Sequence, residues 1–153
     1  MTDYKLIVEQ AKSLAEGNVW DITLYANISA LIFESLDKLN WAGFYLIRGD
    51  ELHLGPFQGK TACLHIPIGK GVCGTAVREN RIVRVENVHE FPGHIACDSA
   101  SESEIVLPVR HTGKIIGVLD IDSTILGRFT EEDEQGLAQI VEEVENSILQ
   151  GEY

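Results

Sequence analysis

Two long apolar segments joined by a two-residue turn constrain the fold of this chain more than any other feature. Residues 104–111 and 114–122 flank a Thr-Gly pair. A connection this short joins strands that run antiparallel. Side chains alternate between the two faces of a strand, so Ile105 and Leu107 share one face and Glu104 lies on the other. The sequence therefore predicts an antiparallel sheet with one apolar face.

Helical patterns stand at both ends of the chain. We expect Thr2 to cap a short first helix and Asp21 to cap a longer one that stops near Asn40. The segment 130–133 reads TEED, a capping-box pattern that opens a last amphipathic helix. Further strands are expected at residues 41–47, 51–54, 64–68 and 82–85, with a small helix at residues 72–79. The order of elements predicts an α+β domain, with helices covering one face of the sheet and function on the other.

Length and charge narrow the class of protein. The 153 residues suit a single domain, and 44% of them are hydrophobic, which is typical of a globular protein. The formal net charge of −12 disfavours nucleic acid and anionic lipid as partners. No apolar run approaches the roughly 18 residues that a bilayer crossing needs. The N-terminus carries no visible secretory signal, so we expect a cytoplasmic protein without membrane contact.

Acidic and aromatic side chains gather on the face opposite the expected helices. Asp120 and Asp122 end a strand that reads IIGVLDID, although aspartate is depleted in sheets. By strand parity they share one side, and Trp41 and Tyr45 share one side of another strand. The carboxylates could bind a cation, act as acid and base, or flank a turn. The aromatic pair could equally belong to a core.

Three cysteines, Cys63, Cys73 and Cys97, leave an odd thiol in any disulfide scheme. With His65 and His94 they could assemble a zinc site, but the closely spaced ligand pairs of structural zinc sites are missing. They could also be inert core thiols. Because Cys73 lies between glycines and Cys97 lies in a long segment without periodicity, redox chemistry is favoured.

Taken together, these segments resemble one known family. The motifs are NWAGFYLI, GPFQGKTACLHIPIGKGVCGTAV, NVHEFPGHIACDSASESEIVLPV, GKIIGVLDIDS and RFTEEDEQGLAQI. Over about residues 20–148 the chain is similar to the GAF-domain free methionine-(R)-sulfoxide reductases. The resemblance implies a single GAF domain over residues 1–153 with a central antiparallel sheet of about six strands. The N- and C-terminal helices would pack on one face, and a loop-covered ligand pocket would lie on the other.

The resemblance also assigns roles to the cysteines. Cys97 matches the nucleophile, Cys73 the main resolving thiol, and Cys63 a further thiol able to pair with Cys73. Thiolate attack on the sulfoxide would release methionine and leave a sulfenic acid on Cys97. Condensation with Cys73 would then form a disulfide that thioredoxin reopens. No metal, flavin or nucleotide cofactor is required.

Substrate recognition follows from the same matches. Glu104, Asp120 and Asp122 match the acidic substrate-binding residues, and Trp41 and Tyr45 match an aromatic wall. A free amino acid carries an ammonium group that peptide-bound methionine lacks, so clustered carboxylates would select it. Like-charge repulsion would keep one carboxyl protonated, and we expect Asp122 to donate that proton and Asp120 to anchor the ammonium. Family members are often dimers, which implies a homodimer here.

Two other functions remain open from the sequence. A GAF module without turnover would bind a small molecule as a sensor, although such modules usually stand beside an output domain. A structural zinc-binding interaction domain would use the cysteines as ligands.

Overall fold

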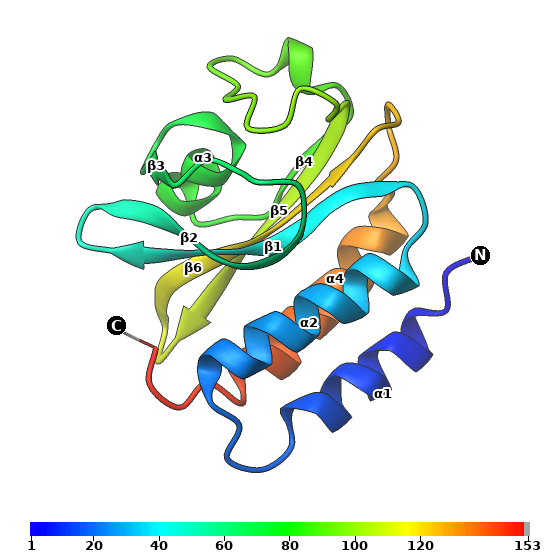
Figure 1. Cartoon of the computed structure of the whole chain (residues 1–153), viewed down its shortest axis with the longest axis vertical. Coiled ribbons are helices and arrows are strands. Elements are labelled where there is room, and N and C mark those ends of the chain that lie inside the picture. The colour runs from blue at the N-terminus through cyan, green and yellow to red at the C-terminus, as the bar shows by residue number, and fades with distance from the viewer. Residues whose placement is uncertain (152–153) are drawn as a thin grey trace.

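The computed structural model describes residues 1–151 (Figure 1). The helices are α1 (Tyr4–Ala15), α2 (Asp21–Ser35), α3 (Gly71–Glu79) and α4 (Glu131–Glu145), with a short 3₁₀ turn η1 (Val88–Glu90). The strands are β1 (Leu39–Arg48), β2 (Glu51–Gly59), β3 (His65–Pro67), β4 (Val83–Val85), β5 (Ser103–His111) and β6 (Lys114–Ser123). None of these described helices combines the length and apolarity that a membrane crossing requires.

All six strands form one sheet in the order β3-β2-β1-β6-β5-β4. Each neighbouring pair is antiparallel, which confirms the sheet expected from the sequence. The strand that contains Pro67 lies at an edge, where the missing backbone N–H costs no ladder hydrogen bond. The two-residue turn between β5 and β6 sets their register, with Glu104 opposite Asp122.

The two faces of the sheet carry different layers (Figure 1). Helices α1, α2 and α4 lie together on one face, while α3 and the loops around it lie on the other. Phe44 and Leu107 point into the core beneath the three helices. Trp41 and Tyr45 point into a second, smaller apolar cluster under α3. The alternation read from the sequence is confirmed, and it leaves the α3 side of the sheet for the site.

Two of the expected helix starts are wrong. Asp3, rather than Thr2, caps α1, because its carboxylate accepts a hydrogen bond from the Leu6 N–H at 3.1 Å. Trp20 is the N-cap of α2, and Asp21 is its first residue. The Asp21 carboxylate instead accepts backbone N–H groups of the C-terminal segment, at 2.7 Å from Leu149 and at 3.0 and 2.9 Å from the next two residues. The capping box of α4 forms as expected at Thr130 and Asp133.

The second helix also stops earlier than expected. It ends at Ser35, and the chain enters β1 at Leu39, so Asn40 is already a strand residue. Between them Lys38 adopts a positive φ of 63°, which breaks the helical path.

Candidate active site

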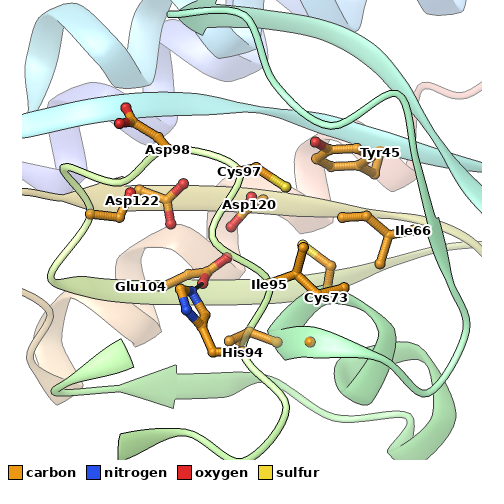
Figure 2. A pocket seen from close by; sticks show the side chains of 13 residues that line it. Tyr45, Ile66, Cys73, His94, Ile95, Cys97, Asp98, Glu104, Asp120 and Asp122 are labelled. Carbon is orange, nitrogen blue, oxygen red and sulfur yellow. Dashed lines mark ion pairs between the residues drawn. The ribbon is translucent and has the colours of Figure 1, made fainter. Parts of the chain in front are cut away.

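A small, partly open cavity of about 30 Å³ lies between the sheet and the segments around α3 (Figure 2). The cavity draws its lining from strands β1, β3, β5 and β6, from α3 and from the segment before β5. The side chains expected from the sequence that line it are Tyr45, Cys73, Cys97, Glu104, Asp120 and Asp122. The cavity therefore brings together six of the eight site residues expected from the sequence.

Strand register explains why three carboxylates converge in this cavity. Glu104 on β5 faces Asp122 on β6, and Asp120 lies two residues earlier on the same side of β6. Glu104 is only 6% exposed and Asp120 only 5%, while Asp122 is half-buried. The expected acidic cluster is thus present, and it lies deeper than solvated carboxylates at a strand end would.

Burial and mutual repulsion set the electrostatics of this cluster. Burial, reinforced by the charges of Asp120 and Asp122, raises the pKa of Glu104 well above its usual range. Burial and the charge of Asp120 likewise raise the pKa of Asp122. Burial also raises the pKa of Asp120, although hydrogen bonds from Glu104 and Cys73 oppose this. The cluster therefore keeps its protons to a higher pH than solvated carboxylates do.

Among the residues that the structure describes, Asp120 Oδ1 has no hydrogen-bond partner although it is buried. A buried acceptor left unpaired is costly, so this oxygen is suited to a donor that a ligand brings.

A disulfide joins Cys63 and Cys97, with the two Cα atoms 5.3 Å apart. Cys73 is a free thiol, only 3% exposed. The expectation that Cys73 is the main partner of Cys97 is therefore wrong for this structure. Cys63, between β2 and β3, is the thiol that meets the segment carrying Cys97. Cys73, in the first turn of α3, is instead hydrogen-bonded to Asp120, and its pKa is raised by burial and by the nearby carboxylates.

The aromatic pair lies where strand parity predicts, but its two members differ in position. Tyr45 lines the cavity, and its hydroxyl donates a hydrogen bond of 2.9 Å to the Cys63 carbonyl. Trp41 is not among the lining residues. Its ring stacks on Tyr45 at 5.8 Å and on Phe57 at 5.1 Å, and its Nε1 donates to the Lys60 carbonyl at 3.1 Å. Trp41 therefore packs against Tyr45, which lines the cavity, without lining the cavity itself.

His94, which the sequence suggested only as a possible zinc ligand, also lines the cavity. Nε2 of His94 lies 3.8 Å from Glu104 Oε1. Burial lowers the pKa of His94, with a smaller contribution from the charge of His89. In Figure 2 the ring approaches the Glu104 carboxyl from the side opposite Asp122.

A group that sequence analysis missed holds the Cys97 segment against β1. Asn40 Nδ2 donates to Asp98 Oδ2 at 2.8 Å and to Ser101 Oγ at 3.0 Å. Asp98 Oδ1 accepts the Ala100 N–H at 2.9 Å, and this bond, with that from Asn40, lowers the pKa of Asp98. The only signal in the sequence was the absence of periodicity, which marks a loop without placing its side chains.

Comparisons with known proteins agree with this geometry. The GAF domain family matches residues 22–148. The free methionine-R-sulfoxide reductase of Escherichia coli is 57% identical over 141 residues, which cover 92% of this chain and 86% of that protein. Protein YtsP of Bacillus subtilis is 52% identical, over 97% of this chain and 92% of its own length.

Solved structures extend the likeness to the fold. The structure described as fRMsr of Staphylococcus aureus in complex with substrate has a TM-score of 0.93 at 52% identity, and 97% of each chain is covered. The reduced form of the same protein has a TM-score of 0.95. The chain belongs to the GAF domain family and, within it, to the free methionine-(R)-sulfoxide reductases.

Proposed function

We propose that this protein reduces free methionine-(R)-sulfoxide to methionine. The observation that carries the proposal is that one cavity holds both a disulfide-forming cysteine, Cys97, and three converging carboxylates. A sensor needs no redox-active thiol beside its ligand. A reductase for a free amino acid needs both the thiol and an anionic group for the ammonium. The relatives named for this activity support the same assignment.

The carboxylates bind the substrate ammonium. Asp120 is the anchor, because its buried Oδ1 lacks a partner among the described residues and so can accept an N–H from the ligand. The thioether end of the substrate lies toward Tyr45, since sulfur contacts aromatic rings favourably by roughly 0.3 to 1.5 kcal/mol. Ammonium binding also neutralises part of the charge that would otherwise oppose a thiolate at Cys97.

The chemical step transfers the sulfoxide oxygen to Cys97. The Cys97 thiolate attacks the sulfoxide sulfur while a carboxyl of the cluster protonates the oxygen, and Asp122 is the donor. Methionine leaves with its sulfur reduced, and Cys97 is oxidised to a sulfenic acid. A nearby acid is essential, because oxide without a proton is a poor leaving group.

The second step regenerates the enzyme through the bond present in the structure. The thiolate of Cys63 attacks the sulfenic sulfur of Cys97, which releases water and forms the Cys63–Cys97 disulfide. A protein dithiol of the thioredoxin class supplies two electrons and two protons to reopen it. Cys73 takes no part in the exchange, because it lies buried beside Asp120.

The pH dependence of kcat should be bell-shaped. The cluster carries raised pKa values, so its protonated form is present below the raised pKa and is lost as pH rises through it. At low pH the rate falls because Cys97 is no longer ionised. Asp122→Asn should lower kcat by at least about a hundredfold, since general acids contribute roughly 10²–10⁴-fold, and should remove the alkaline limb.

Asp120→Asn is the matched comparison for that profile. It removes the same charge from the same strand, yet it should chiefly raise KM and keep the alkaline limb. Steady-state rates for both variants across pH check the assignment. An Asp122→Asn enzyme with wild-type kcat and an unchanged alkaline limb would show that Asp122 is not the acid.

The activity itself is tested by measuring methionine release from each free methionine sulfoxide epimer with dithiothreitol as reductant. We expect catalytic release from the R epimer and little from the S epimer. Tight binding of the R epimer without any release of methionine would instead favour the sensor.

A further inference from the structure

The cavity contains a set of side chains that the proposed reaction leaves unexplained as a group. The Cys73 thiol and the carboxylates of Glu104 and Asp120 offer ligand atoms that all lie within 4.8 Å of one another. All three residues are buried. Methionine sulfoxide reduction requires the carboxylates but gives the Cys73 sulfur no chemical task. A buried thiol within 4.8 Å of two buried carboxylates therefore calls for another explanation.

We propose that Cys73, Glu104 and Asp120 form a binding site for a soft divalent cation of the Zn²⁺ type, which competes with the substrate for the same carboxylates. The ligand atoms of a tetrahedral zinc site lie about 3.3–3.8 Å apart, given bond lengths of about 2.0–2.3 Å. The observed 4.8 Å limit lies within a small side-chain adjustment of that spacing.

A second observation points to a ligand at this place. Asp120 is only 5% exposed, and its Oδ1 lacks a hydrogen-bond partner among the described residues while the side chain lines the cavity. Figure 2 shows the Asp120 carboxyl lying between Glu104 and the Cys97 sulfur, with Cys73 alongside. The described residues that line this cavity include no Lys or Arg. A cation would thus meet oxygens that no protein cation already neutralises.

The donor set selects the class of cation. A thiolate favours Zn²⁺ and similar soft or borderline metals over Mg²⁺ and Ca²⁺, which prefer oxygen ligands alone.

The test uses the full chain with Cys63→Ser and Cys97→Ser combined, which leaves Cys73 as its single thiol and prevents disulfide formation. Anaerobic titration with Co²⁺, a spectroscopic substitute for Zn²⁺, should saturate at one equivalent and produce thiolate-to-cobalt charge-transfer absorption. Added Zn²⁺ should abolish that absorption by displacement. Free methionine should weaken cobalt binding, because its ammonium takes the same carboxylates.

Two further substitutions in that background locate the site. Adding Cys73→Ser should remove the charge-transfer absorption, and adding Glu104→Gln should weaken Co²⁺ binding at least tenfold. Circular dichroism of each metal-free variant checks that it folds. Absence of the absorption in the double variant would overturn the site, as would unchanged binding in the Glu104→Gln variant.

Cobalt binding and methionine release are independent readouts. Methionine release without cobalt absorption would contradict the cation site and support the reductase activity. Cobalt binding as described, without methionine release, would support the cation site and contradict the proposed reductase activity. In a working reductase, Zn²⁺ should raise the apparent KM for methionine sulfoxide without lowering kcat.

Discussion

Replacing Cys97 with serine should abolish methionine release with every reductant, a loss of at least about a thousandfold in kcat. Cys97 is the cysteine that lies in the cavity with the carboxylates and also forms the disulfide. A serine hydroxyl is neither ionised near neutral pH nor able to accept the sulfoxide oxygen in a stable form. Methionine release measured with dithiothreitol and with thioredoxin checks this.

Cys63→Ser is the matched control for that experiment. It removes the other half of the same disulfide but not the thiol that attacks the substrate. It should lose turnover supported by thioredoxin and keep turnover supported by dithiothreitol, because a small dithiol can reduce the Cys97 sulfenic acid directly. Substantial activity in Cys97→Ser would disprove the assignment of the nucleophile.

Acetylation of the substrate amine should lower kcat/KM about ten- to a hundredfold or more. The acetyl group removes the ammonium charge and leaves Asp120 Oδ1 buried without a partner. An unpaired buried polar group costs about 1 to 3 kcal/mol, and more when it is charged. Initial rates on free and N-acetylated methionine-(R)-sulfoxide measure this difference.

Asp120→Asn shows whether the carboxylate is responsible for that discrimination. The variant should have a lower kcat/KM on the free sulfoxide but a nearly unchanged kcat/KM on the acetylated compound. The ratio of the two kcat/KM values should therefore move toward one. Equal efficiency of the wild-type protein on both compounds would refute the proposed binding mode.

Strand alternation and the short β5–β6 turn were sufficient to predict how the acidic cluster forms. They place Glu104, Asp120 and Asp122 on one side of two paired strands, and the structure confirms that placement. In the structure, the same alternation places Phe44 in the core under the three helices and Tyr45 in the cluster under α3. These predictions worked because a strand has a period of two, and a shift of one residue would expose its whole apolar face.

The disulfide partner could not be predicted in the same way. Cys63 and Cys97 lie in segments without periodicity, so their approach depends on how loops pack over the finished sheet. The roles of Asn40 and Asp98 depend on the same packing. The role of Asp21 at the start of α2 could not be predicted either. Its hydrogen-bond partners lie 128 to 130 residues away in the sequence, and no local pattern indicates them.

One turnover without added reductant tests the central claim most directly. Fully reduced protein, freed of reductant and mixed with excess free methionine-(R)-sulfoxide, should release one methionine per chain. Peptide mapping by mass spectrometry should then find Cys63 linked to Cys97 and Cys73 still free, which is the pairing in the structure. No methionine, or methionine released while Cys97 remains a free thiol, would contradict the account.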